Sequence, residues 1–366
     1  MKRIVEYKDG WWDADIGDYL KVIANGMVML QPIINLTTKF SLNLHQQQAM
    51  ASLYNLVKFT SPAFIFGIVF TVIRKYSDKQ KLDLAYAKNQ WANNFFPTAI
   101  WTLIYLLVMP NLQVHEHYHN LTSFIWQFFN GNGAPHLWYS VMMLQFLLIM
   151  PLIKLVTNYV GHNYRRLWSS VIVVGIIYFV WLIFYDKFVF NGPQAQNWYL
   201  LDRVFVSFLI FGFYGGLAWN FHAELQNILF NFWWVVLGIY LVTYFWTRSQ
   251  FFSYKQLTNL TYDTYYRPSM AIYALAVIFL IYLICIAQKV YRMQRCLKTI
   301  HFLAFYAYRA FLANVFWDRI LWQYFGFKAF TEQNLYLGVV ATWVCTWILS
   351  YASVYLCHQV WIRIKK

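Results

Sequence analysis

Long, nearly uninterrupted runs of apolar residues alternate with short polar stretches along this chain. Ten of the runs approach or exceed the roughly 20 residues that a helix needs to cross the hydrocarbon core of a bilayer. They cover residues 19–37, 52–73, 94–110, 136–157, 168–185, 200–221, 228–247, 268–290, 302–322 and 335–360. The pattern therefore predicts an all-α polytopic membrane protein with about ten transmembrane helices.

The distribution of Lys and Arg predicts how these helices are oriented. If the N-terminus is cytoplasmic, the inner segments hold eighteen Lys and Arg residues and the outer loops hold six. Because cytoplasmic loops carry the excess of positive charge, we expect both termini to be cytoplasmic. The longest loops, 74–93 inside and 110–135 outside, are too short for a second domain. Residues 1–366 are therefore expected to form a single transmembrane domain.

Composition supports a membrane protein and argues against a nucleic-acid partner. Apolar residues make up 60% of the chain and charged residues only 12%, whereas a soluble domain carries about 25% charged residues. The formal net charge is +15, but the basic residues are dispersed over many loops rather than gathered in one patch. We therefore interpret the charge as a topology signal and as a source of contacts with anionic membrane lipid.

Histidine occurs in two settings with different implications. His115, His117 and His119 alternate in an outer loop, but we expect no metal site there, because nothing in the sequence provides a scaffold for the ligands. His136 instead begins the fourth apolar segment, followed by Trp138 and Tyr139. These residues either anchor the helix start at the headgroups or contact a substrate at the mouth of the protein.

Basic residues inside apolar segments are functional candidates, because charge is costly in a bilayer. The five are Lys21, Lys58, Arg203, Arg309 and Arg319. Arg203 and Arg319 each follow an Asp and are expected to pair with it. Arg309 has no obvious local partner and is a candidate for lining a cavity. Lys21 either snorkels to the interface or meets an anionic cofactor.

The inner loop 74–93 is strongly basic and includes Arg74, Lys75 and Lys88. Such a loop commonly reflects topology or contact with anionic lipid. It could equally receive the phosphates of a coenzyme, since Lys binds phosphate as a point charge. The sequence leaves both interpretations open.

Six stretches, in order along nearly the whole chain, resemble the acyltransferase 3 family of bacterial membrane proteins that O-acylate surface polysaccharides. They are 18–24, 61–67, 88–105, 136–139, 211–216 and 266–269. The stretch from His136 to Tyr139, for example, is similar to the "H-L-W-F/Y" start of the family's fourth helix. The closest similarity is to the branch of poly-N-acetylglucosamine O-succinyltransferases.

The resemblance implies a multi-pass protein of the bacterial plasma membrane. It would move an acetyl or succinyl group from a cytoplasmic acyl-CoA donor to a hydroxyl of a cell-surface polysaccharide or its lipid-linked precursor, without a metal. On this interpretation Lys21, Arg74, Lys75 and Lys88 receive the donor. The remaining candidates form the catalytic and acceptor site, with His136 as base: they are Gln31, Trp138, Arg203, Arg267 and Arg309.

Several positions depart from the family pattern. Pro32 and Phe311 stand where the family has histidines, in its first and ninth helices, and Lys21 stands where it has an arginine. Neither Pro32 nor the neighbouring Gln31 can act as a general base, because neither side chain takes up a proton near neutral pH. The alternative is therefore a non-catalytic relative, such as a scaffold, transporter-like or immunity protein, that binds a glycan, lipid or peptide without turnover. A transporter is a weaker alternative, because no broken helix or inverted repeat is evident.

Overall fold

The apolar segments form the long helices of a bundle. The computed structural model describes residues 14–78, 82–254 and 256–365, and this part of the chain contains helices and no strand. The helices up to the middle of the chain are α1 (Ile16–Val28), α2 (Leu30–Thr37), α3 (Leu44–Leu56), α4 (Thr60–Lys75), α5 (Leu84–Gln90), α6 (Phe96–Val108), α7 (Leu121–Asn130) and α8 (Leu137–Val160). The remaining helices are α9 (Tyr164–Tyr185), α10 (Leu209–Asn220), α11 (His222–Asn231), α12 (Trp233–Phe252), α13 (Pro268–Val290), α14 (Gln294–Tyr324), α15 (Phe327–Gln333) and α16 (Leu335–Lys365).

The prediction of apolar helices long enough to cross a membrane is confirmed for part of the set. Among the described residues, six helical segments have the length and composition of a span. They are 16–37, 44–75, 137–160, 164–190, 268–290 and 335–364. A seventh arises if α11 and α12 are counted as one span bent by 79°. The bend lies at Phe232, where no Pro or Gly marks the sequence, so the broken helix was not anticipated.

The other expected spans are shorter or more polar than the sequence pattern indicated. The helix α6 has only 13 residues, and α10 has 12 residues preceded by the tight turns η5 (Tyr199–Arg203) and η6 (Phe205–Phe208). The helix α14 is long, with 31 residues, but carries several charged side chains along its length. The number of ten spans therefore remains a prediction.

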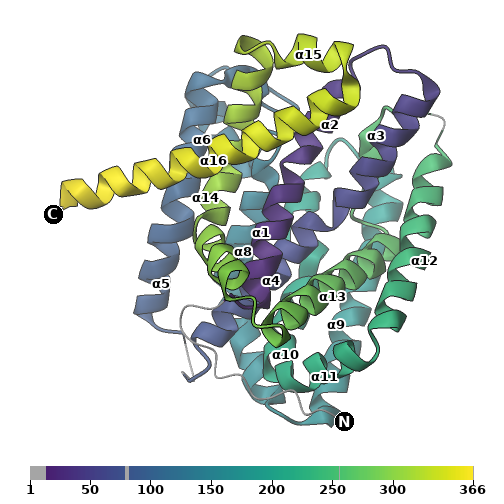
Figure 1. The fold of residues 1–366 in the computed structure, drawn as a ribbon, viewed down its shortest axis with the longest axis vertical. Coiled ribbons are helices and arrows are strands. Elements are labelled where there is room, and N and C mark those ends of the chain that lie inside the picture. Colours follow the sequence, from purple (N-terminus) through teal and green to yellow (C-terminus); the bar gives the residue numbers. More distant parts are fainter. Residues whose placement is uncertain (1–13, 79–81, 255, 366) are drawn as a thin grey trace.

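The helix α1 lies at the centre of the bundle and packs against α4, α13 and α14 (Figure 1). Glycine permits the closest of these contacts. A Cβ atom at Gly67 of α4 would lie 2.9 Å from Cβ of Leu20 on α1, which is closer than carbon atoms approach in folded proteins. The side chains of Leu20, Phe66 and Val69 are fully buried at this centre.

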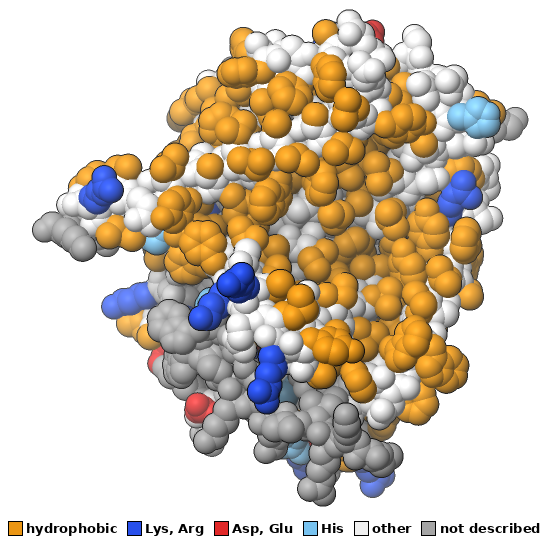
Figure 2. Space-filling model, in the orientation of Figure 1, with side chains coloured by type: hydrophobic (Ala, Val, Ile, Leu, Met, Phe, Trp, Pro, Cys, Tyr) orange, Lys and Arg blue, Asp and Glu red, His pale blue; other side chains and the backbone are white. Residues whose placement is uncertain are grey.

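Apolar side chains cover much of the outside of the bundle. Figure 2 shows them spread over the face crossed by α16, and exposed large apolar residues occur on α6, α9, α12 and α16. A soluble protein rarely exposes so much contiguous apolar surface. This surface is what a protein embedded in a membrane presents to lipid.

One expected ion pair is formed and the other is not. Arg203 contacts Asp202, with 2.6 Å between Nε and Oδ1. Asp318 is fully buried, neither of its carboxylate oxygens has a hydrogen-bond partner, and it forms no ion pair with Arg319. The expectation for Arg319 was therefore wrong, because neighbouring residues on an α-helix point about 100° apart.

Candidate functional site

A cavity of about 440 Å³ opens at the end of the bundle where α2 and α14 finish and α4 and α8 begin. We call this end the outer end, after the predicted orientation, and the cavity the outer cavity. Its walls come from α2, the start of α4, the start of α8, α14 and the loops 186–208 and 253–267. Segments far apart in the sequence therefore meet around one space.

Three of the residues expected to form a site meet in the outer cavity: Gln31, His136 and Trp138. The Trp138 ring packs beside Phe208 and Tyr265, with ring centroids 6.1 and 5.8 Å apart. The aromatic wall that results suits a ligand with an apolar face and polar edges.

His136 is held in one orientation at the start of α8. Its Nε2 atom lies 3.3 Å from the backbone oxygen of Leu312. Because a carbonyl oxygen only accepts hydrogen bonds, Nε2 must carry the proton in this contact, which leaves Nδ1 as an acceptor in the neutral ring. Nδ1 is buried and has no hydrogen-bond partner. The ring of His136 packs edge-on against Tyr105 and Phe311.

The loop before α8 sets the position of His136. Gly131 ends α7 with a φ of +78°, in the left-handed region that favours glycine. A Cβ atom there would lie 3.0 Å from Cα of Trp138 and 2.9 Å from Cγ2 of Val141. The chain therefore turns tightly onto the first turn of α8.

Gln31 acts as a link between helices rather than as a reactive group. Its Nε2 donates to the backbone oxygen of Val57 at 3.0 Å and to Oγ1 of Thr60 at 2.9 Å, and lies 3.5 Å from the Tyr265 hydroxyl. Gln31 therefore ties α2 to the start of α4 and to the wall of the cavity.

Lys58 places a buried positive charge in the outer cavity. It lies in the short turn η1 (Val57–Phe59), is only 6% exposed, and donates to the Tyr54 hydroxyl at 3.2 Å. Its Nζ atom also lies 4.5 and 4.4 Å from the ring centroids of Tyr54 and Tyr265. The sequence marked Lys58 as a lysine in an apolar segment but gave no sign that it faces a cavity.

Asp263 is the acidic residue that the sequence analysis missed. It lines the outer cavity, is 2% exposed, and accepts a hydrogen bond of 3.0 Å from Nδ2 of Asn55, whose Oδ1 in turn accepts one from Thr247. Burial raises the pKa of the Asp263 carboxyl to about 6, against the opposing influence of the nearby Lys58 ammonium. In the sequence, the one indication of a role for Asp263 is its position in a long outer loop between two apolar segments.

Polar atoms without partners gather around the outer cavity. Four residues that line it have a buried polar atom with no hydrogen-bond partner: Nδ1 of His136, the hydroxyl of Tyr139, Oδ2 of Asp263 and Oδ1 of Asn314. Since an unsatisfied buried polar group costs about 1–3 kcal/mol, such groups call for an explanation. A polar ligand that contacts these atoms would supply the missing partners.

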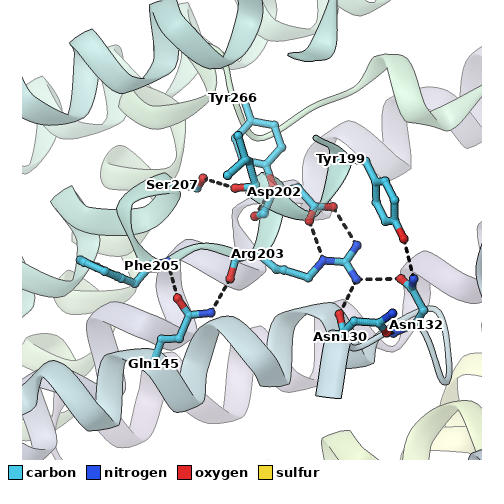
Figure 3. Close-up of polar contacts among 10 residues, drawn as sticks. Asn130, Asn132, Gln145, Tyr199, Asp202, Arg203, Phe205, Ser207 and Tyr266 are labelled. Carbon is cyan, nitrogen blue, oxygen red and sulfur yellow. Dashed lines mark hydrogen bonds and ion pairs between the residues drawn. The ribbon is translucent and has the colours of Figure 1, made fainter. Parts of the chain in front are cut away.

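Arg203 braces the wall of the cavity and does not line it. Figure 3 shows its guanidinium between Asp202 and the segment that carries Asn130 and Asn132. Its guanidinium contacts Asp202 through two nitrogens, at 2.6 and 3.2 Å, and donates to the Asn130 backbone oxygen and to Oδ1 of Asn132, both at 2.7 Å. Asn132 in turn donates to the Tyr199 hydroxyl at 2.9 Å. Arg203 therefore fastens loop 186–208 to the loop that leads to His136.

The two other candidate arginines do not line the outer cavity. Arg267 caps the start of α13 and donates to the Tyr254 hydroxyl at 2.6 Å, near the rim. Arg309 lies at the middle of α14 and donates to Oδ1 of Asn93 at 3.0 Å. The structure therefore separates Arg309 from the other residues assigned to an acceptor.

At the opposite, inner end, the residues assigned to a donor lie in different settings. Lys21 pairs with Asp18 at 2.8 Å, and Arg74 pairs with Asp15 at 2.8 Å. Lys75 and Lys88 are exposed. A second cavity of about 650 Å³, the inner cavity, lies nearby and is lined by polar residues that include Lys154, His162 and His222.

An aromatic layer forms the floor of the outer cavity. Phe64 packs against Tyr139, Tyr308 and Phe311, with ring centroids 5.8 to 6.5 Å apart. A void of only about 10 Å³ lies among these side chains. The layer stands between the outer cavity and the inner half of the bundle.

No group of three or more His, Cys, Asp or Glu residues within the described ranges is placed to hold a metal ion. In the outer loop, His115 instead packs against the Tyr199 ring, with centroids 4.0 Å apart.

Comparison with known proteins identifies no relative: no family model, no curated protein and no solved structure matches the chain.

Proposed function

We propose that this chain is a ten-span protein of the bacterial plasma membrane with both termini in the cytoplasm. It transfers an acetyl or succinyl group from an acyl-CoA donor to a hydroxyl of a cell-surface polysaccharide or its lipid-linked precursor. The observation that carries the proposal is the outer cavity, where four unpartnered polar atoms and an aromatic wall surround one space. Aromatic faces beside amide, hydroxyl and carboxyl groups match the alternating apolar and polar surfaces of a sugar.

His136 is the base in this proposal. The acceptor hydroxyl oxygen attacks the thioester carbonyl, and its proton passes to Nδ1 of His136, the nitrogen left free by the contact of Nε2 with Leu312. The new C–O bond forms as the C–S bond breaks, and the thiolate takes the proton back from the imidazolium. The products are the O-acylated sugar and the free thiol.

Two departures from the pattern of the acyltransferase 3 family lie at this site. Pro32 and Phe311, which stand where the family has histidines, both line the outer cavity although they are far apart in the sequence. In this chain the task of the base falls to His136, whose ring packs against Phe311.

The donor reaches the reaction from the inner end. Lys21 and Arg74 are engaged in ion pairs, so the charge of Lys21 is balanced within α1 and that of Arg74 ties the start of α1 to α4. The inner cavity, with Lys154 on its wall, is the larger polar space near loop 74–93, and we assign the phosphate-bearing part of the donor to it.

The test compares surface polysaccharide from the wild-type strain and from a strain without this protein. Acetyl and succinyl esters are released by mild alkali and quantified. The proposal expects a loss of one of the two esters in the deletion strain and its return on complementation. Unchanged ester content in the deletion strain would contradict it.

A second candidate function is non-catalytic binding of a glycan. The aromatic floor favours it, because Phe64, Tyr139, Tyr308 and Phe311 stand between the outer cavity and the inner half of the bundle. Purified protein in lipid vesicles separates the two functions. Acyl-CoA added to the inner face is consumed in the presence of a glycan acceptor if the protein is an acyltransferase, and is left intact if it only binds.

A further inference from the structure

The ammonium group of Lys58 is a buried cation with donors to spare. Lysine has three N–H donors, and the described contacts of Lys58 include one hydrogen bond, to the Tyr54 hydroxyl. Among the described residues no carboxylate lies within ion-pair distance of its Nζ, although Asp263 is close enough for the two charges to interact. Lys58 is 6% exposed, so bulk water covers little of it.

The surroundings of Lys58 determine the sign of the charge on a ligand that it can bind. The rings of Tyr54 and Tyr265 both contact Nζ, at 4.5 and 4.4 Å from their centroids, so the aromatic site for a cation is already filled by the protein itself. The unused N–H donors need acceptor oxygens. A second cation in the cavity would be repelled, whereas an anion would be attracted and only weakly screened by water.

The nearest acidic side chain does not meet this need. Asp263 holds Asn55 through Oδ1, and its Oδ2 atom has no hydrogen-bond partner. Below its pKa of about 6 the carboxyl carries a proton, and Oδ2 can then donate to the same anion that Lys58 attracts. A carboxylate has two oxygens, enough for Lys58 and for the protonated Asp263 together.

We infer that the outer cavity recognises a ligand that carries a carboxylate, and that Nζ of Lys58 is the group that binds it. The inference rests on the proposed function for what that ligand is. The carboxylate belongs either to the acyl group, as in a succinyl half-ester, or to the acceptor sugar, as in a uronic acid.

The experiment measures binding to the purified full-length protein in detergent, with the fluorescence of its tryptophans, including Trp138 at the cavity, as the signal. The probes are monomethyl succinate for the acyl source, glucuronate for the sugar source, and glucose as a neutral sugar. The variants are Lys58→Met, Lys58→Arg and, as a matched control, Lys39→Met, an exposed lysine at the same end of the bundle.

The inference expects one of the two carboxylates to bind wild type at least about tenfold more tightly than Lys58→Met, the size expected for a charge-assisted hydrogen bond. Lys58→Arg should retain most of the affinity, and Lys39→Met all of it. The probe whose affinity falls in Lys58→Met shows whether the acyl group or the acceptor sugar carries the carboxylate. Binding of neither carboxylate to wild type, or equal binding to wild type and Lys58→Met, would overturn the inference.

This outcome is independent of the proposed function. Since the readout is binding, a strain comparison that shows no acyl transfer would leave a Lys58-dependent carboxylate site in place. Conversely, if acyl transfer persists in Lys58→Met, the proposed function stands and the inference that Lys58 binds a carboxylate is wrong. Glucose should bind wild type and Lys58→Met equally, which also shows that the variant is folded.

Discussion

Asn55 on α3 donates a hydrogen bond of 3.0 Å to Asp263, which lies 208 residues further along the chain. The contact joins the helix α3 to the loop that closes the outer cavity. Asn55 is fully buried, and Thr247 on α12 donates to its Oδ1 at 3.1 Å, which fixes which end of the amide faces Asp263. A carboxyl group is thereby held in a defined orientation beside Lys58.

The buried carboxyl of Asp263 should make stability depend on pH. Its folded pKa of about 6 exceeds the usual value of 3.8. A raised pKa means that the folded state binds the proton more tightly, so this contribution to stability falls as the pH rises from about 4 to about 6. Asp263→Asn removes the charge, and its stability relative to wild type should increase by about 1 kcal/mol between pH 5 and pH 8.

Thermal unfolding of wild type and Asp263→Asn in detergent, at pH 5 and pH 8, measures this effect. Glu332→Gln, at an exposed carboxylate, is the control and should show no such difference. If the stability of Asp263→Asn relative to wild type does not increase from pH 5 to pH 8, the prediction for this residue is wrong.

Arg203 should be essential to the wall of the outer cavity. Lysine cannot replace it, because a single ammonium cannot hold Asp202, Asn130 and Asn132 in the fork geometry of a guanidinium. Arg203→Met leaves Asp202 without its partner and should cost about 3 kcal/mol of stability. Lys187→Met, at an exposed residue of the same loop, should cost almost nothing. Chemical denaturation in detergent compares them, and equal midpoints would refute the bracing role.

The ion pair between Lys21 and Asp18 separates a structural role from donor binding. Asp18 is buried and also contacts Nδ1 of His301 at 2.8 Å, so Lys21→Met removes one of its two partners, whereas Asp18→Asn removes the partner of Lys21, and each should destabilise. The double variant should recover about 1 kcal/mol of the sum, as residues in contact do. If the losses of stability in the two single variants add up to the loss in the double variant, the ion pair contributes nothing to stability. A loss of acyl-CoA binding in Lys21→Met that is absent in Asp18→Asn, which keeps the lysine, would support the assignment of Lys21 to the donor.

Gly131 should tolerate no side chain. Its φ of +78° costs other residues about 1–2 kcal/mol, and a Cβ atom would also crowd Val141 and Trp138. Gly131→Ala should therefore lose roughly 2 kcal/mol or more and displace His136. Gly238→Ala on α12, where a Cβ atom meets nothing within 4 Å, should be neutral or stabilising. The order of the two unfolding midpoints checks the prediction, and a reversed order would contradict it.

The sequence predicted the helices better than their lengths. Apolar runs reveal where a helix forms, and each expected span contains one. They do not reveal that the run 200–221 begins as the tight turns η5 and η6, or that the chain bends by 79° at Phe232. Such features depend on how neighbouring helices pack, and no Pro or Gly at 229–233 marks the bend.

The same limit applies to the outer cavity. His136 and Trp138 could be found because they stand at the start of a predicted helix, and Gln31 because the family resemblance singles out its neighbour Pro32. Asp263 and Asn314 could not, since no periodicity distinguishes a side chain that faces a cavity from one that faces a helix. Arg203 was correctly paired with Asp202, but its contacts with Asn130 and Asn132 depend on loop geometry that only the fold provides.

The most direct test of the central claim is the ester content of surface polysaccharide in cells that express His136→Ala at the wild-type level, in place of the wild-type protein. Lys39→Met, away from the cavity, serves as the matched variant. The account predicts that His136→Ala lowers the ester content about 100-fold or more, the contribution of a general base, while Lys39→Met retains it. Wild-type ester content in His136→Ala cells would contradict the claim that the outer cavity is where the acyl group is transferred.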